Sequence, residues 1–305
     1  MRNSPVSARL SARRLLSAVF GTLAIACADP VQRATAPSGA PGTPPPVPTL
    51  ATIPYIYLAD ADGTVRGRLT MGMWPSWSPD GRRILFERDW NVWVIDADGS
   101  NERQLVAGRW PTWAPDGATI AFVAEKRILI MNADSLGART LMTPALNIMS
   151  RFDEVGNLDW SPDGKTIAFQ TLSMDWPSKI ILINADGSAE RGLTSLVGWE
   201  SRNEDGARWS PDGSRLLFWS TDAGLQTVDR TGGTLTTVYT DVEYGARAAW
   251  SPDGRTITFN TGGSNPSIVR VPANGGVATP FIADGREADW SPDGKRIAFV
   301  RAHLR

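Results

Sequence analysis

The sequence predicts an all-β protein, a six-bladed β-propeller whose last blade is closed by strands from both ends of the chain. Two observations support this prediction: a pentapeptide that recurs through the chain, and a short run of strand-forming residues after each copy. The pentapeptide is Trp-Ser-Pro-Asp-Gly in five copies and Trp-Ala-Pro-Asp-Gly in one, and successive copies begin 36 to 49 residues apart, at Trp77, Trp113, Trp160, Trp209, Trp250 and Trp290. This spacing suits one four-stranded blade per repeat.

Each repeat contains the residues of four short strands. The pentapeptide is followed by an apolar run such as Ile84-Leu85-Phe86, and after a variable loop by a second run such as Val92 to Ile95. A second turn, for example Asp96-Ala97-Asp98-Gly99, then leads into a fourth strand. Short β-branched and aromatic runs between turn residues are typical of strands.

The pentapeptide itself is predicted to end the first strand and form a turn. Pro presets φ for the second position of a type I turn, Asp suits the third, and Gly takes the left-handed φ at the fourth. The preceding Trp offers a large flat surface for packing against the neighbouring blade. Because a catalytic acid is needed once and the Asp occurs six times, we interpret these Asp residues as structural.

The two ends of the chain are predicted to share one blade. Residues 55–70 have the third and fourth strands of a blade with no pentapeptide before them, whereas residues 290–301 have the pentapeptide and second strand only. Together they complete a sixth blade, which closes the ring and leaves no open sheet edge at its ends.

The N-terminus is predicted to be an export signal. Arg13 and Arg14 precede the uncharged apolar stretch Leu15 to Ala26, which is too short to span a bilayer. The stretch ends at Cys27, the only cysteine, in a pattern that resembles a bacterial lipobox. We therefore expect a lipoprotein signal peptide at 1–26, with ordinary signal cleavage beside an incidental Cys as the alternative.

A tether is predicted between the lipid site and the folded domain. Residues 27–52 are rich in Pro and Ala, a composition that cannot bury enough apolar surface to fold. The propeller is expected at 53–305. These features predict a protein of the bacterial periplasm or cell envelope, anchored by Cys27. The residue after the cysteine is Ala28 rather than Asp, which favours anchoring in the outer membrane over the inner one.

The repeats resemble those of the TolB-like, or WD40-like, β-propeller family. The resemblance rests on six copies of the pentapeptide together with the Asp-Ala-Asp-Gly hairpins, and it covers residues 53–305. It implies a propeller fold, which hosts unrelated activities. TolB proteins also have an α/β domain ahead of the propeller, where this sequence has the tether, so a role in the Tol–Pal system stays open.

The sequence offers few residues for catalysis, so we do not expect an enzyme or a bound cofactor. The single His is His303, no Gly-x-Ser-x-Gly motif occurs, and zinc sites of His and Cys cannot be assembled. Calcium on the Asp-Ala-Asp-Gly turns stays open, although such turns are already explained as hairpins. Without residues 1–26 the formal charge is −5, and no basic patch for nucleic acid is present.

The candidate binding site lies in the parts that the repeat does not require. The loops between second and third strands and between blades share one face, vary in length, and contain aromatic and charged residues typical of binding sites. Residues just before each repeat Trp, including Arg208, could line the channel mouth. The candidates are Arg109, Arg151, Asp153, Glu154, Asn157, Trp176, Trp199, Glu200, Arg202, Arg247 and Arg286.

The predicted function is non-catalytic binding of an envelope protein, a peptide or a glycan by a monomeric lipoprotein. Two alternatives remain. Trp176 and Trp199 could merely hold their own loops in place, and the chain could be a propeller-type enzyme, such as a polysaccharide lyase, whose arginines bind a carboxylate-rich sugar.

Overall fold

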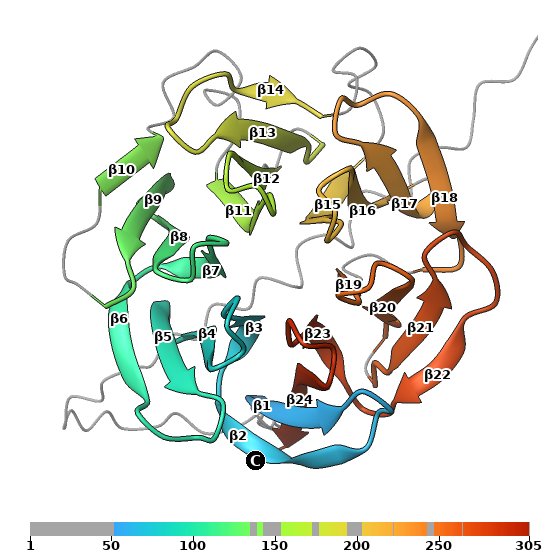
Figure 1. Cartoon of the computed structure of the whole chain (residues 1–305). Coiled ribbons are helices and arrows are strands. Elements are labelled where there is room, and N and C mark those ends of the chain that lie inside the picture. The colour runs from blue at the N-terminus through green and yellow to red at the C-terminus, as the bar shows by residue number, and fades with distance from the viewer. Residues whose placement is uncertain are drawn as a thin grey trace, which may run out of the picture. The chain divides into compact units, whose positions relative to one another are not determined.

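The structure is a computed structural model that describes residues 52–134, 139–142, 154–172, 177–193, 203–221, 223–242, 247–263 and 265–304. In these residues, six four-stranded antiparallel sheets surround a central channel (Figure 1). The predicted all-β, six-bladed propeller is confirmed. Cys27, Arg151, Asp153, Trp176, Trp199, Glu200 and Arg202 lie outside the described residues.

Each blade is numbered here in chain order, and its strands run from the channel to the rim. Blade 1 contains β3 (Met73–Trp77), β4 (Arg83–Arg88), β5 (Asn91–Asp96) and β6 (Arg103–Ala107). Blade 2 contains β7 (Arg109–Trp113), β8 (Thr119–Ala124), β9 (Arg127–Asn132) and β10 (Arg139–Met142). Blade 3 contains β11 (Glu154–Trp160), β12 (Thr166–Leu172), β13 (Ile180–Asn184) and β14 (Arg191–Gly192).

The remaining blades follow the same order. Blade 4 contains β15 (Glu204–Trp209), β16 (Arg215–Ser220), β17 (Gly224–Asp229) and β18 (Leu235–Tyr239). Blade 5 contains β19 (Ala248–Trp250), β20 (Thr256–Asn260), β21 (Ile268–Pro272) and β22 (Thr279–Ile282). Blade 6 contains β23 (Arg286–Trp290), β24 (Arg296–Leu304), β1 (Thr52–Asp60) and β2 (Val65–Met71).

Blade 6 closes the ring with strands from both ends of the chain, as predicted. Its strand order is β2-β1-β24-β23, so the first strand of the chain lies beside the last. The pairing of β1 with β24 runs without interruption from Thr52 opposite Leu304 to Asp60 opposite Arg296.

The repeated pentapeptide forms a hydrogen-bonded turn that fixes the start of each second strand. In blade 1, the Gly81 amide donates to the Ser78 carbonyl at 2.8 Å, and Gly81 has a φ of 67°. Asp80 Oδ1 accepts from Ser78 Oγ at 2.6 Å and from the Arg82 amide at 3.0 Å. The same Ser-to-Asp bond recurs in the other Ser-containing copies, at Ser161–Asp163, Ser210–Asp212, Ser251–Asp253 and Ser291–Asp293.

The hydrophobic core lies between neighbouring blades. Each second strand contributes a fully enclosed Phe, with at most 1% exposure: Phe86, Phe122, Phe169, Phe218, Phe259 and Phe299. The repeat Trp packs toward the preceding blade. Trp113 of blade 2, for example, shares a cluster with Leu85 and Val92 of blade 1.

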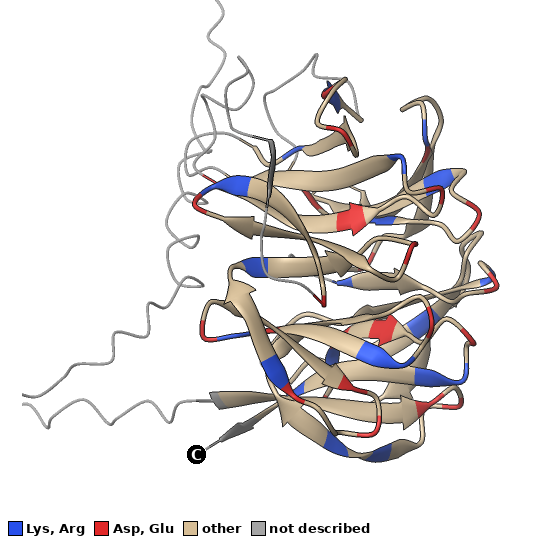
Figure 2. Ribbon diagram, turned by 60° about the vertical axis from the view of Figure 1, so that its left-hand side comes forward, with Lys and Arg blue, Asp and Glu red and all other residues tan. Residues whose placement is uncertain are grey.

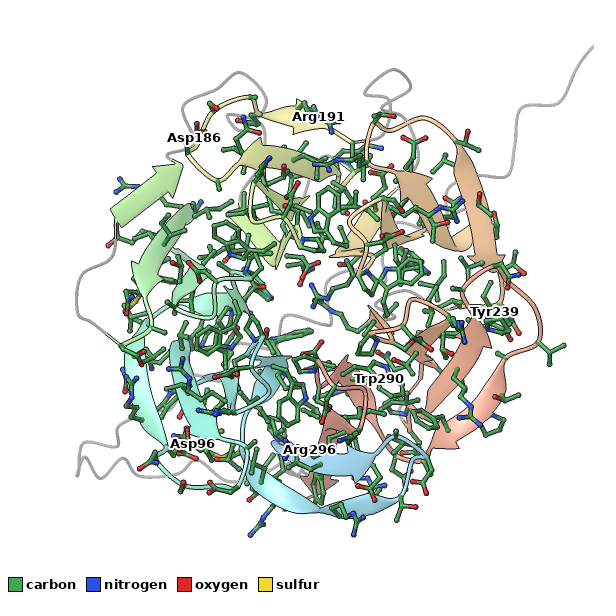
Figure 3. The ribbon with its side chains drawn as sticks, in the orientation of Figure 1. Asp96, Asp186, Arg191, Tyr239, Trp290 and Arg296 are labelled. Atoms are coloured by element: carbon green, nitrogen blue, oxygen red, sulfur yellow. The ribbon has the colours of Figure 1, made fainter. Side chains whose placement is uncertain are left out.

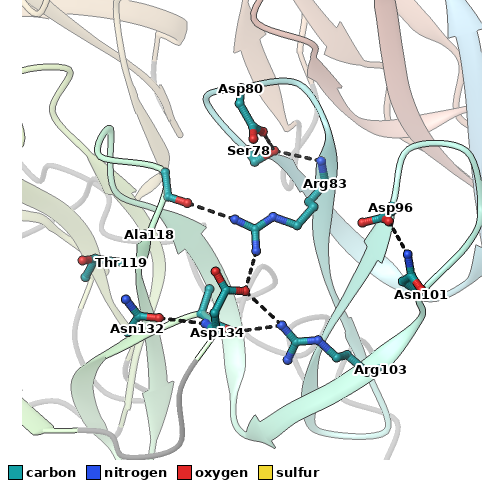
Figure 4. A network of polar contacts seen from close by, with 12 residues as sticks. Ser78, Asp80, Arg83, Asp96, Asn101, Arg103, Ala118, Thr119, Asn132 and Asp134 are labelled. Carbon is teal, nitrogen blue, oxygen red and sulfur yellow. Dashed lines mark hydrogen bonds and ion pairs between the residues drawn. The ribbon is translucent and has the colours of Figure 1, made fainter.

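Arginine side chains add polar contacts across the seams between blades (Figure 4). Arg83 of blade 1 stacks over Trp113 at 4.7 Å and donates to the Gly117 carbonyl and to Asp134 of blade 2. Arg296 of blade 6 likewise stacks over Trp77 at 4.7 Å and donates to the Gly81 carbonyl of blade 1.

Basic and acidic residues are interspersed along the strands and turns in the view of Figure 2. Side chains of both signs occur on neighbouring elements rather than on separate faces there. None of the described residues forms a helix long and apolar enough to cross a membrane.

Candidate functional site

The innermost strands carry β-bulges three residues before the repeat Trp. Five residues at this position have left-handed φ values between 49° and 67°: Trp74, Trp110, Asn157, Gly206 and Glu287. The pairing of each of these strands with its second strand shifts at the same place. Because a bulge re-aims side chains, the residues on either side of it can both face the channel.

A narrow cavity lies within the channel at the level of these bulges. Its volume is about 40 Å³, which is room for one or two water molecules. The side chains of all six blades approach one another toward the middle of the ring, whereas Asp186, Arg191 and Tyr239 lie near the rim (Figure 3). The cavity is lined by Trp74, Pro75, Ser76, Trp110, Pro111, Thr112, Asn157, Leu158, Asp159, Arg208, Arg247 and Asp289.

Arg247 crosses the channel beside this cavity. It immediately precedes β19 of blade 5, yet its Nη1 donates to Asn157 Oδ1 on blade 3 and its guanidinium stacks over the Trp74 ring of blade 1 at 3.9 Å. The acceptor is held firmly, because the Asn157 amide donates to Gln170 and to Asp205, the latter at 2.9 Å. A single side chain therefore links three blades.

Two carboxylates and one guanidinium form a second group in the channel. Asp159 of blade 3 accepts from the Trp209 amide at 2.7 Å, and Asp289 of blade 6 accepts from the Trp77 amide at 2.8 Å. Burial raises the pKa of each carboxyl to about 6, partly offset by the charge of Arg208. The negative charge of Asp159 also raises the pKa of Asp289.

Arg109, the first residue of the inner strand β7, lies between two indole rings; it forms, with Trp90, Trp110, Glu87 and Glu154, the group called the channel mouth. The Arg109 guanidinium lies 4.1 Å from the ring centre of Trp90 and 4.0 Å from that of Trp110. Its Nε donates to Glu87 Oε1 at 3.0 Å, and its Nη1 lies 3.7 Å from Glu154 Oε1. Burial raises the pKa of both carboxyl groups, and the Arg109 charge opposes that rise.

Trp90 is the exposed member of this group. It is 64% exposed, whereas Trp110 is 7% exposed. Trp90 and Asp89 form the two-residue turn between β4 and β5, with φ values of 62° and 50°. A type I′ turn requires such values at both positions and strongly favours Gly at the second. The chain therefore holds a large apolar side chain in solvent at a strained backbone position.

The structure places the described candidate residues in two groups. Arg109 and Glu154 belong to the mouth, and Asn157, Arg208 and Arg247 line the cavity. Arg286 begins β23, and its Nε lies 3.5 Å from its neighbour Glu287. The six remaining candidates outside the described range stay predictions.

Sequence reasoning missed Trp74, Trp90 and Trp110, which contact the candidate arginines. A signal was available for two of them, because Trp74-Pro75-Ser76-Trp77 and Trp110-Pro111-Thr112-Trp113 repeat one pattern in adjacent blades. Trp90 follows Asp89 in a two-residue connection between strands, and this short loop could have marked a hairpin tip.

A metal site would need several ligand side chains close together in the described part of the chain. There, no group of three or more His, Cys, Asp or Glu side chains is arranged so that it could hold a metal ion.

Comparison with known proteins identifies the fold. No family model and no curated protein matches the sequence. Among solved structures, a putative TolB from Agrobacterium tumefaciens is 20% identical, with a TM-score of 0.70, over 84% of this chain and 100% of its own. The chain therefore has a TolB-like β-propeller fold, as predicted.

Propellers of other kinds are also similar. An oligogalacturonate lyase in complex with manganese is 16% identical, with a TM-score of 0.55, over 82% of each chain. A chain of a nidogen/laminin complex is 11% identical, with a TM-score of 0.58, over 82% of this chain and 98% of its own. At these identities the likeness concerns the fold.

Proposed function

We propose that this protein is a non-catalytic lipoprotein of the cell envelope that binds a protein or peptide partner at the channel mouth. The observation that carries the proposal is Trp90, exposed at a strained turn and stacked on Arg109. Strained backbone of this kind clusters at functional sites, and Trp and Arg are the side chains most enriched in binding hot spots.

The construction of the mouth supports recognition by a pre-formed surface. Arg109 is fixed by Trp110 on one side and by Glu87 and Glu154 at its nitrogens, so little side-chain freedom is lost when a partner covers Trp90. Propellers of the same fold occur in TolB and in a nidogen/laminin complex, which favours a polypeptide partner. The Cys27 pattern supports a lipid anchor, and loss of fatty-acid labelling in Cys27→Ala is its check.

The decisive variant is Trp90→Gly, compared with wild type and with Val277→Gly. Val277 is 82% exposed and lies next to Gly276 in the turn between β21 and β22, away from the mouth. Because Gly fits the left-handed turn, Trp90→Gly should leave the free energy of unfolding unchanged or raise it by up to about 1 kcal/mol.

Binding should respond in the opposite way. A photo-crosslinking amino acid at position 90 should capture a partner in native cells, and one at position 277 should not. Affinity for the captured partner should fall by a factor of about 30 in Trp90→Gly, or about 2 kcal/mol. Equal affinity in the two variants, or unfolding of Trp90→Gly, would contradict the proposal.

The same variants separate the alternatives. Glycan-array binding that is lost in Trp90→Gly would identify a glycan rather than a polypeptide as the ligand. The similarity to an oligogalacturonate lyase in complex with manganese makes that reaction the enzyme activity to test. Incubation with oligogalacturonate and manganese should yield no ultraviolet absorbance from an unsaturated product, and its appearance would replace the binding proposal.

A further inference from the structure

Packing alone does not explain why charged side chains gather within the channel. Asp159 and Asp289 project from blades 3 and 6, opposite members of the ring, and Arg208 of blade 4 is the cation near both. Replacing buried charged groups with apolar residues is often neutral or stabilising, so a propeller needs no such group to fold. Perturbed titratable groups in a cavity are typical of functional positions.

Arg247 lies where it restricts access to this group. It shares the cavity lining with Asp159, Arg208 and Asp289, and its side chain spans from blade 5 to Asn157 and Trp74. The cavity that remains has a volume of about 40 Å³. It has room for one or two water molecules and for nothing larger.

The Arg247 side chain spans two fixed points. At its base, the Arg247 amide donates to Asn260 Oδ1 at 2.9 Å, and at its tip Asn157 is held by Gln170 and Asp205. Between these points the arginine is a chain of single bonds that hydrogen-bonds to Asn157 and stacks on the Trp74 ring. Rotation about its side-chain bonds would free the channel without any movement of a strand.

We propose that Arg247 is a latch that closes the channel from Asn157 to Trp74 and opens by rotation of its side chain. Opening widens access to the partly exposed Asp159–Arg208–Asp289 group from the channel. This closure does not depend on the partner or on the Trp90 mouth, so it stands or fails separately from the proposed function.

The test measures how fast a reagent reaches a thiol beside the cavity. Cys27→Ala removes the only native thiol from the full chain, and Ser76→Cys then places one in the cavity lining. The rate of its reaction with a small methanethiosulfonate reagent is compared with that of Val277→Cys, an exposed position on a turn. Because Ser76 is partly exposed within a narrow cavity, Ser76→Cys should react about ten times more slowly than Val277→Cys in the closed channel.

Opening the latch should raise that rate selectively. Arg247→Ala should increase the Ser76→Cys rate several-fold and leave the Val277→Cys rate unchanged. Arg247→Lys keeps the charge but lacks the planar guanidinium, so it should give an intermediate rate. It also serves as a control in case the Ala variant fails to fold. Asn157→Ala should accelerate the reaction in the same direction.

Two results would overturn the latch. Rapid reaction of Ser76→Cys in the otherwise unchanged chain would show that the channel is open. A slow rate that neither Arg247→Lys nor Arg247→Ala increases would show that other side chains close it.

Discussion

The channel and its mouth depend on side chains held at unfavourable backbone angles. Trp74, Trp90 and Trp110 have φ values of 57°, 62° and 49°, in a region that bulky residues rarely adopt. Such strain costs on the order of 1–3 kcal/mol per residue and persists where the surroundings over-determine it. Two of these rings carry the stacked guanidinium of Arg109, and the third carries that of Arg247. These three positions therefore favour the stacking contacts of the Trp side chains at a cost in stability.

The channel carboxylates are expected to make the stability of the folded protein depend on pH. Burial raises the pKa of Asp159 to about 6 in the folded state from 3.8, so the folded chain binds the proton more tightly than the unfolded chain. This contribution to stability is fully present below pH 3.8 and is lost as the pH rises through about 6. Between pH 5 and pH 8, the loss is on the order of 1 kcal/mol.

Asp159→Asn should remove this contribution while its amide oxygen still accepts from the Trp209 amide. Urea unfolding at pH 5 and pH 8 should therefore show a smaller fall in the free energy of unfolding than in wild type, by roughly 1 kcal/mol. Asp253→Asn is the control, because hydrogen bonds lower the pKa of Asp253 and it stays ionised across this range. A pH dependence equal to that of wild type would contradict the assignment.

At the scale of the strand and turn, the repeats were sufficient to predict most of the fold. The pentapeptide predicted the turn after each inner strand, because Pro, Asp and Gly each suit one position of it. The bulges could not be predicted, since Trp74-Pro75-Ser76-Trp77 has no alternation of apolar and polar residues that would show a break. Their position before the repeat Trp made Asn157 and Arg247 candidates for the channel, but it gave no information on the partners that they contact.

Gly108, which directly precedes the inner strand β7, offers a test at the scale of the strand. Gly108 has a φ of 157°, and a Cβ there would lie 2.6 Å from Phe122 Cδ2 and 3.0 Å from the Val123 carbonyl oxygen. Gly108→Ala should lower the free energy of unfolding by about 1–3 kcal/mol, because Phe122 is fully buried and cannot move away freely. The measurement is a denaturation curve.

Gly67→Ala on β2 is the matched control for this substitution. A Cβ at Gly67 meets nothing within 4 Å, so the change should shift stability by no more than about 0.5 kcal/mol. Similar losses in both variants would mean that backbone entropy rather than the contact with Phe122 determines the cost.

At the scale of the whole molecule, the ring is stabilised by contacts between neighbours and by one closure. Six core clusters each join two adjacent blades, including the cluster in which Ile56 and Val300 of blade 6 meet Trp77 and Phe86 of blade 1. Four-stranded sheets of this kind do not bury both faces alone, so removal of any blade exposes two seams. The closing blade therefore determines whether the ring unfolds as a unit.

Deletion of residues 52–71 removes β1 and β2 and tests this closure. It leaves β24 unpaired along its edge and uncovers Ile297 and Phe299, both fully buried in the complete ring. Exposed strand edges recruit other chains, so the truncated protein should aggregate or lose its single cooperative thermal transition. Deletion of residues 28–48 is the control, because the composition of that Pro- and Ala-rich segment predicts no core contacts and hence an almost unchanged melting temperature. A cooperative transition at the wild-type temperature after loss of residues 52–71 would show that five blades and half of the sixth fold without the N-terminal strands.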